Sequence, residues 1–357
     1  MNTNREYGKG ISAGRLILIL IVFFAFAGVC GCQPSADIDN KTTTTRLLMD
    51  TRVDLTLYGA DKKTSDQVAE AVFSEMERLE NMISRTIPTS ELNKINMSAG
   101  KEWVKVEPEL FFLLQKALEV SVLSGGAFDP TVAPLIELWG FGGDHPQVPS
   151  EEDLQKLLPL VDYKLVEMDE ESFMVYLPVE GMKLDLGGIA KGFIVDRGLE
   201  TASQFGLQSF FINAGGDISM SGVKPSGEKW VIAVQDPKAS SEATDIVNNV
   251  AVLWLEGDGS VVTSGDYQRY FEENGVKYHH ILDPENGKPA RRLSSVTIVA
   301  DNATVADALS TASFVLGKEK GLSLLESMPG IDGIFVDPEG NINYTSGLEG
   351  RIELIKN

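Results

Sequence analysis

The stretch Met182–Gly198, MKLDLGGIAKGFIVDRG, is the most informative part of this chain. Its first five residues are mostly apolar and predict a short strand, and Gly187 and Gly188 then permit a sharp turn. From Ile189 onward, apolar residues at helical spacing predict a helix with Lys191 in its first turn. Because a helix N-terminus presents unpaired N–H groups and partial positive charge, the pattern predicts an anion site. An ordinary strand-to-helix turn with a surface lysine explains the same residues.

The composition is that of a large globular protein with an acidic surface. The 357 residues are 43% hydrophobic and 23% charged, which suits one large domain or two closely packed lobes. The formal net charge of −21 argues against nucleic acid as a partner, because the surface would repel phosphates. A phosphate-bearing ligand must therefore find local positive charge from a helix end, a lysine or a metal ion.

The N-terminal segment predicts export and lipid anchoring. Basic residues precede an apolar run at 16–27, which is short for a membrane-spanning helix. The VCGC sequence that ends at Cys32 resembles a bacterial lipobox with Cys32 as the lipidated residue, and a simple secretory peptide or an uncleaved anchor is the alternative. Cleavage before Cys32 leaves no cysteine that could pair with it in a disulfide. We therefore expect a protein anchored to a membrane on its extracytoplasmic side, with a signal peptide at 1–31, a flexible tether at 32–45 and a folded domain at 46–357.

The periodicity of the remaining chain mixes both kinds of secondary structure. Strands are expected at 47–59, 182–186, 209–212, 217–220, 230–235, 250–255, 260–263, 278–282, 295–300 and 333–336. Helices are expected at 65–82, 108–124, 151–160, 189–199, 304–316 and 318–327, with a short helix capped by Ser90. The order predicts an α+β protein with antiparallel sheets and packed helices rather than regular βαβ winding.

Asp307 and Thr311 are a candidate metal site. They are four residues apart on one predicted helix, so both side chains face the same way. A carboxylate and a hydroxyl are hard oxygen ligands that suit Mg²⁺. The alternative is a capping box of Thr304 and Asp307, with Thr311 bonded back to a carbonyl. From spacing alone the capping interpretation is the stronger one.

The adjacent histidines are candidates for proton transfer. In a strand, His279 and His280 point to opposite faces, so one can be buried while the other is exposed. His280, just before a glycine-containing turn, is the candidate general base, and a satisfied core histidine is the alternative. Zinc is not expected, because no second ligand pair stands at the required spacing. Other candidates have structural explanations: Asp185, Asp217 and Asp266 as turn residues, and Phe128, Trp139 and Phe193 as core.

Taken together, the motifs resemble those of the FAD:protein FMN transferases, the ApbE-like enzymes once described as thiamine-biosynthesis lipoproteins. The matching segments follow the family order: Met49-Asp50-Thr51, SELNKIN at Ser90–Asn96, GGAFDPTVAPL at Gly125–Leu135, LDLGGIAKG at Leu184–Gly192, NAGGD at Asn213–Asp217, VQDP at Val234–Pro237, TSGDYQRYF at Thr263–Phe271, HHILDPENGKPA at His279–Ala290 and VADALSTA at Val305–Ala312. Two positions depart from the family pattern, Asp50 where a small residue is common and Thr86 where an aromatic residue is common. The resemblance implies an α+β, T-fold-like architecture.

The resemblance also implies an activity. Such an enzyme uses Mg²⁺ to split FAD, passes FMN to a Thr or Ser hydroxyl of a target protein through a phosphoester bond, and releases AMP. The implied acceptor is a subunit of a membrane redox complex. The metal would be held by Asp307, Thr311 and the carbonyl of Ala190, and His280 would help to deprotonate the acceptor hydroxyl. The implied FAD contacts are Met49, Ala127, Phe128, Asp129, Asp185, Gly187, Lys191, Phe193 and Ile281.

Two other functions remain open from the sequence. A metal-dependent FAD pyrophosphatase would use water in place of the protein hydroxyl and release FMN and AMP. A flavin-binding lipoprotein would hold FAD without any chemistry. The pairing of Asp307 with Thr311 favours an enzyme over a binding protein, because a binder has no need of a metal at the diphosphate.

Overall fold

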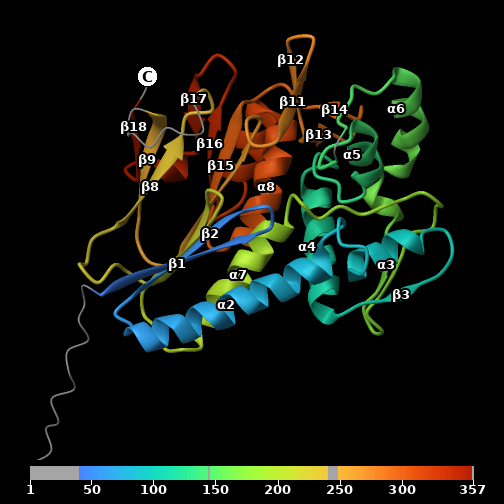
Figure 1. The fold of residues 1–357 in the computed structure, drawn as a ribbon. Helices are drawn as coiled ribbons and strands as arrows, with labels where there is room; N and C mark the ends of the chain where they lie inside the picture. The colour runs from blue at the N-terminus through green and yellow to red at the C-terminus, as the bar shows by residue number, and fades with distance from the viewer. Residues whose placement is uncertain (1–39, 144, 240–247, 356–357) are drawn as a thin grey trace, which may run out of the picture. The chain divides into compact units, whose positions relative to one another are not determined.

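The computed structural model describes residues 40–143, 145–239 and 248–355, which belong to one compact unit (Figure 1). The predicted signal peptide at 1–31, Cys32 and most of the predicted tether lie outside these residues. Within the described ranges, no helix is long and apolar enough to cross a membrane.

The helices begin and end at local sequence signals. Asp61 caps the longest helix by accepting a hydrogen bond from the Thr64 N–H at 2.7 Å. Pro108 opens another helix at a position where its missing N–H costs nothing. The helices are α2 (Lys62–Ile83), α3 (Glu91–Met97), α4 (Pro108–Leu123), α5 (Ala133–Trp139), α6 (Glu151–Leu157), α7 (Ala190–Ser203), α8 (Ala303–Leu316) and α9 (Lys318–Glu326), with short 3-10 turns at Leu158–Leu160, Tyr163–Leu165 and Ser346–Leu348.

The largest sheet is antiparallel throughout, so the predicted α+β class is confirmed. In spatial order its strands are β1 (Lys41–Leu48), β2 (Thr51–Tyr58), β6 (Phe210–Ala214), β7 (Asp217–Ser221), β10 (Gly259–Gly265), β15 (Ser295–Ala300), β16 (Asp332–Val336) and β17 (Ile342–Tyr344). Smaller sheets pair β9 (Asn249–Leu255) with β8 (Trp230–Gln235) and β18 (Ile352–Leu354), and β5 (Met174–Tyr176) with β3 (Val104–Lys105) and β4 (Glu167–Asp169). Two hairpins join β11 (Tyr270–Glu273) to β12 (Val276–His279) and β13 (Leu282–Asp283) to β14 (Lys288–Pro289).

The central strands of the large sheet are covered on both faces. One face packs against α2, α7 and α8 in the main core, as Figure 1 shows for α8 in front of β15. The other face packs against the sheet of β8, β9 and β18 in a second core. Neighbouring residues of one strand therefore belong to different cores, with Val262 in the first and Val261 in the second. This explains why β15 and β16 are buried at every position.

The predicted tether and first strand need correction. Residues 41–45 are not tether, because they form the first part of β1. The expected single strand at 47–59 is a hairpin: Met49 and Asp50 have φ of 53° and 56° and turn the chain between β1 and β2. Positive φ at two successive positions is the geometry of a type I′ turn, which usually needs Asn or Gly. The sequence Met-Asp gave no such signal.

Two other expected strands are wrong in their extent. Residues 182–186 form only an isolated bridge, between Lys183 and Val132. The side chain of Asn96 explains this, because it bonds both the N–H of Leu184 at 2.7 Å and its carbonyl at 3.0 Å, as a neighbouring strand would. The expected strand at 278–282 ends at His279, which leaves the next residue in a bend outside the β12 strand.

Candidate functional site

The site is organised where α7 and α8 touch. The N–H of Gly192 in α7 donates to Oδ2 of Asp307 in α8 at 2.9 Å. A Cβ atom on Gly192 would lie 2.9 Å from the Cβ of Asp307 and would overlap the carbonyl of Ala303. Only glycine lets the two backbones come this close, so it places the first turn of α7 beside the Asp307 carboxylate.

Asp307 is not a capping residue. The N-cap of α8 is Asn302, whose side chain accepts from the Val305 N–H at 3.0 Å. Thr304 is occupied elsewhere, since its hydroxyl donates to the Asp196 carboxylate of α7 at 2.5 Å. The capping-box interpretation is therefore wrong, and the Asp307 carboxylate is left to face α7 with a side chain that is 5% exposed.

Thr311 belongs to a cluster of hydroxyl groups one turn further along α8. Its Oγ1 lies 3.3 Å from Oγ of Ser264 in β10, which in turn lies 2.7 Å from Oγ of Ser310. Gly188 faces this cluster, since a Cβ there would lie 3.1 Å from Oγ1 of Thr311 and 3.2 Å from the Phe128 ring. The glycine turn thus keeps a small space open beside the Thr311 hydroxyl. Sequence reasoning missed both serines.

Lys191 has a partner within the protein. Its ammonium forms an ion pair with Asp217, which is 1% exposed and lies at the start of β7. The other carboxylate oxygen of Asp217 accepts from the Thr263 N–H at 3.0 Å. Asp217 is therefore no mere turn residue, and a bound anion is not needed to explain a lysine at this helix end. The glycine-rich NAGGD segment, which ends at Asp217, was the sequence feature that could have indicated this role.

The N–H groups of the first turn of α7 are also in use. The N–H of Ala190 donates to the Leu186 carbonyl at 2.7 Å, and that of Gly192 donates to Asp307. No side chain caps this end of α7. The structure therefore reduces the number of free donors that the predicted anion site was expected to offer.

Burial and mutual charge perturb these groups. Burial, together with the nearby Asp217 carboxylate, raises the pKa of Asp307 to about 7. Burial alone would lower the pKa of Lys191, but the Asp217 and Asp307 carboxylates outweigh it and raise that pKa. The α7–α8 contact therefore brings together a carboxyl group whose pKa is near 7 and an ammonium group that stays charged.

The side chain of Asp185 holds the Gly187–Gly188 turn in place. Its carboxylate accepts from the Gly187 N–H at 2.6 Å and forms an ion pair with Arg85. The Arg85 guanidinium also donates to the Phe141 carbonyl at 3.2 Å. Asp185, an implied FAD contact, is thus held beside the turn, and the part played by Arg85 was not foreseen from sequence.

The loop that follows α4 is packed beside this turn. Phe128 is 4% exposed and Ala127 is half-buried. Both carboxylate oxygens of Asp129 serve the loop itself: one accepts from the N–H and hydroxyl of Thr131, and the other from the Tyr163 N–H at 2.9 Å. Burial raises the pKa of Asp129. Its side chain therefore shapes the loop, and a ligand would meet this segment chiefly through other atoms.

The two histidines have different surroundings. Both ring nitrogens of the buried His279 are used, because Nε2 donates to the Ala290 carbonyl at 2.6 Å and Nδ1 accepts from the Ile281 N–H at 3.3 Å. His280 is half-buried, and its Nδ1 lies 3.1 Å from the Arg269 carbonyl. A carbonyl only accepts, so Nδ1 carries the proton and Nε2 is the basic nitrogen. Desolvation lowers the pKa of His280 to about 4, which keeps the ring neutral.

The β1–β2 turn reaches the same region. The N–H of Met49 donates to the Glu80 carboxylate at 3.0 Å, and Asp50 lies 3.8 Å from the Arg269 guanidinium. The Arg269 carbonyl is the group that accepts from both the backbone and the ring of His280. Asp50, a departure from the family pattern, is thus connected to His280 through one residue.

The remaining implied residues are buried. Phe193 is 3% exposed and its ring lies 6.3 Å from that of Phe112, while Ile281 is 5% exposed. Trp139 is core, as expected, and its indole N–H donates to the Gly287 carbonyl at 2.7 Å. Tyr267 was not foreseen: burial and the neighbouring carboxylates, with Asp217 first among them, raise its pKa to about 12.

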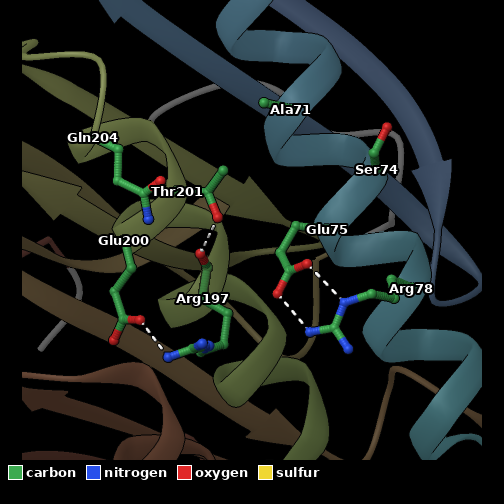
Figure 2. Close-up of a pocket in the computed structure, with 8 residues that line it drawn as sticks. All are labelled: Ala71, Ser74, Glu75, Arg78, Arg197, Glu200, Thr201 and Gln204. Carbon is green, nitrogen blue, oxygen red and sulfur yellow. Dashed lines mark hydrogen bonds and ion pairs between the residues drawn. The ribbon is translucent and has the colours of Figure 1, made fainter.

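A surface hollow of about 450 Å³ lies away from these residues, between α2 and α7 (Figure 2). Its arginines are paired, Arg78 with Glu75 and Arg197 with Glu200. It contains none of the implied site residues, being lined by Ala71, Ser74, Glu75, Arg78, Arg197, Glu200, Thr201 and Gln204. It therefore gives no support to an additional anion site.

Comparison with known proteins identifies the family. The ApbE family matches residues 49–335. The chain belongs to the ApbE family. It is 36% identical over 300 residues to the FAD:protein FMN transferase of Treponema pallidum, covering 80% of this chain and 81% of that one, and 35% identical over 301 residues to that of Klebsiella pneumoniae, covering 84% and 90%.

Solved structures agree with this assignment. The ApbE protein of Thermotoga maritima superposes with a TM-score of 0.79 at 37% identity, covering 87% of this chain and 99% of its own. The flavinyl transferase ApbE of Pseudomonas stutzeri, in its apo form, superposes with a TM-score of 0.76 at 29% identity, covering 87% and 96%. The ApbE-like architecture expected from the motifs is therefore confirmed.

Proposed function

We propose that this protein is a Mg²⁺-dependent FAD:protein FMN transferase, which moves FMN from FAD to a Thr or Ser hydroxyl of another protein and releases AMP. The observation that carries this proposal is the buried Asp307 carboxylate, which faces the first turn of α7 next to the Thr311 hydroxyl. It occurs in a chain whose curated relatives are FAD:protein FMN transferases. Neither observation alone would suffice, because buried carboxylates also occur in ion-pair networks.

The donor set suits a hard divalent cation. Among the described residues, no three His, Cys, Asp or Glu side chains form a group that could hold a metal, so carboxylate, hydroxyl and carbonyl oxygens must share the task. The space that Gly188 leaves beside Oγ1 of Thr311 fits this requirement. We assign Asp307, Thr311 and the carbonyl of Ala190 to Mg²⁺, which when bound would neutralise charge on the diphosphate as its P–O–P bond breaks.

The residues around the glycine turn would position FAD. The Gly187–Gly188 turn allows a diphosphate to approach the backbone closely, and Asp185 holds that turn in place. Lys191 supplies one positive charge, which it shares with Asp217. The loop from Ala127 to Asp129 and the buried Phe193 and Ile281 line the same region in this assignment.

His280 would handle the acceptor proton. In the transfer, the acceptor oxygen forms a bond to the FMN phosphorus, the bond between that phosphorus and the bridging oxygen breaks, and AMP leaves with the bridging oxygen. The hydroxyl proton must go to a base within hydrogen-bond reach. Nε2 of His280 is unprotonated at neutral pH and its ring orientation is fixed by the Arg269 carbonyl, so it can accept that proton.

We also propose that the protein works outside the cytoplasm, anchored through a lipid on Cys32. The support is the basic start, the short apolar run and the VCGC sequence. An exported enzyme cannot easily retain diffusible FMN, so covalent transfer to a partner protein suits this location.

The test uses an extract of extracytoplasmic proteins from cells that make this protein. The purified enzyme is incubated with the extract, FAD and Mg²⁺, and AMP release and flavin fluorescence on denatured protein bands are measured together. The expected result is equal amounts of AMP and protein-bound flavin, both abolished by Asp307→Asn and retained by Asp301→Asn, which removes an exposed carboxylate close to the start of α8. Free FMN in place of labelled protein would make the enzyme a hydrolase, and tight FAD binding without AMP would make it a flavin-binding protein.

A further inference from the structure

The strand β1 forms an unusually long open edge of the large sheet. It spans eight residues, Lys41–Leu48, and pairs with β2 without a bulge. The opposite edge, β17, has only three residues. Proteins usually protect edge strands with proline, bulges, inward charges or covering elements, because an open edge can pair with another chain. The sequence of β1, KTTTTRLL, has no proline, and within the described part of the chain no other strand pairs with its outer side.

Hydrogen bonds within the sheet show which groups of β1 point outward. The carbonyl of Arg52 accepts from Gly215 and the N–H of Tyr58 donates to Ser209, so even-numbered residues of β2 bond toward β6. Because directions alternate along a strand, the odd-numbered residues of β2 bond to β1, and their partners there are even-numbered. The outward N–H and C=O groups of β1 therefore belong to Lys41, Thr43, Thr45 and Leu47.

These four residues also expose their side chains, and Leu47 is 80% exposed. Three of the four are Lys or Thr, which a neighbouring strand can accommodate without burying an unpaired carboxylate. The edge therefore offers four pairs of backbone groups at regular spacing, which is the arrangement used in β-strand addition.

The end of this edge leads to the candidate site. After Leu48 the chain turns through Met49 and Asp50, and Asp50 faces Arg269, whose carbonyl holds His280. The end of the β1 edge therefore lies one side-chain contact away from the residue that positions His280. The opposite edge has no comparable connection among the described residues, since β17 lies at the far end of the sheet order from β1 and β2.

We propose that β1 docks the acceptor protein by strand addition, and that this docking delivers the acceptor Thr or Ser to His280. This inference rests on the proposed transferase function. The partner is an extended, β-prone segment whose backbone pairs with Lys41, Thr43, Thr45 and Leu47. Strands are spaced about 4.8 Å apart, so an added strand lies roughly 15 Å from β6, whose C-terminal turn leads to Asp217. The modified Thr or Ser lies beyond the paired segment, on the side of the Met49–Asp50 turn.

The test compares proline with valine at the same two positions. Full-length Thr43→Pro/Thr45→Pro removes two outward N–H donors, and edge strands tolerate proline where the N–H faces solvent. Full-length Thr43→Val/Thr45→Val keeps both donors but loses the same hydroxyls, including the one that bonds to Asp54. The acceptor is the protein that the wild-type enzyme labels in the extract described above, purified and titrated. The proline variant should have a kcat/KM for this acceptor that is at least about tenfold lower than that of the wild type. The valine variant should keep kcat/KM within about twofold of wild type, and the FAD dissociation constant of both variants should stay within about twofold.

A second measurement does not depend on the proline variant folding. In the wild-type enzyme, acceptor binding should slow amide hydrogen exchange at Lys41, Thr43, Thr45 and Leu47, since these are the amides of β1 that have no hydrogen-bond partner among the described residues. Equal labelling rates for the folded proline and valine variants, with no slowing of exchange, would overturn the docking site. A proline-dependent change in the sedimentation of the enzyme alone would instead assign the edge to a second copy of this chain. If the wild-type enzyme labels no protein, the transferase function fails, and this inference fails with it.

Discussion

Gly192→Ala should disturb the α7–α8 contact more than any other single-methyl change in α7. Its Cβ would meet the carbonyl of Ala303 well inside the 3.3 Å at which carbon and oxygen normally touch, and the neighbouring atoms are backbone that cannot rotate away. The helices must separate by about 1 Å or more, which typically costs about 1–3 kcal/mol. Loss of the Gly192 hydrogen bond to the Asp307 carboxylate adds about 1.5–3 kcal/mol. The gain in helix propensity returns only about 1 kcal/mol.

The matched control is Gly198→Ala in the same helix. Its Cβ would lie 2.9 Å from Cδ1 of Ile212 and 3.3 Å from Sδ of Met76, both of which are ends of flexible side chains. It gains the same helix propensity and avoids a backbone clash, so its free energy of unfolding should stay within about 1 kcal/mol of wild type.

Thermal unfolding and Mg²⁺ titration measure the difference. The net loss for Gly192→Ala is about 1.5–5 kcal/mol, which at about 2 °C per kcal/mol for a protein of this size lowers Tm by about 3–10 °C. Gly198→Ala should change Tm by no more than about 2 °C. Mg²⁺ should bind at least about tenfold more weakly to Gly192→Ala, because Asp307 and the first turn of α7 no longer keep their spacing. A Gly192→Ala enzyme with wild-type Tm and Mg²⁺ affinity would show that the close contact does not define the site.

Three further predictions concern single groups. Asp307→Asn should lower Mg²⁺-dependent turnover by about 10²-fold or more. It should not lower Tm at pH 8. Because the pKa of Asp307 is raised, ionisation of this buried carboxyl lowers the stability of the folded protein as pH rises through about 7, and Asn does not ionise. At saturating Mg²⁺, the loss of turnover due to protonation of His280 should occur as pH falls through about 4, whereas a limb near 6.5 would contradict its role or its environment. Cys32→Ser should move the protein from the membrane to the soluble fraction, and unchanged fractionation would refute lipid anchoring at that residue.

Local sequence signals predicted most of the fold. The strand at 295–300 has the expected bounds, and α4 begins at Pro108 and ends one residue before the expected Ser124. Ser90 caps α3 as expected, by accepting from the Asn93 N–H at 3.1 Å. In these cases the signal is carried by the residues themselves, through a fixed proline φ, a capping oxygen or β-branched side chains.

The errors occurred where a distant residue supplies the backbone partner. Leu184 lies in an apolar run typical of a strand, but the Asn96 side chain takes both of its backbone groups. The Met49–Asp50 turn lacks the usual Asn or Gly, and its contacts come from Glu80 and Arg269, far away in sequence. Nothing in the local pattern could reveal these partners, since propensity describes only neighbours along the chain.

The candidate site shows the same division. The spacing of Asp307 and Thr311 was sufficient to suggest a metal site. Only the structure excludes the capping box, because it shows that Asn302 caps α8 and that the Thr304 hydroxyl bonds to Asp196. The pairing of Lys191 with Asp217 was also invisible, since the two are 26 residues apart and meet only when α7 packs on the sheet.

That pairing changes the electrostatic argument for FAD. The sequence suggested that Lys191 and the N-terminus of α7 supply the positive field for a diphosphate. In the structure the ammonium faces two carboxylates, Asp217 and Asp307, and the Gly192 N–H is already bonded to Asp307. When all three side chains are ionised, they carry a net charge of about −1, which opposes a doubly negative diphosphate at short range in a buried site. The Mg²⁺ proposed above would reverse that sign, so under that proposal the charges of this chain would favour FAD binding together with the cation rather than before it.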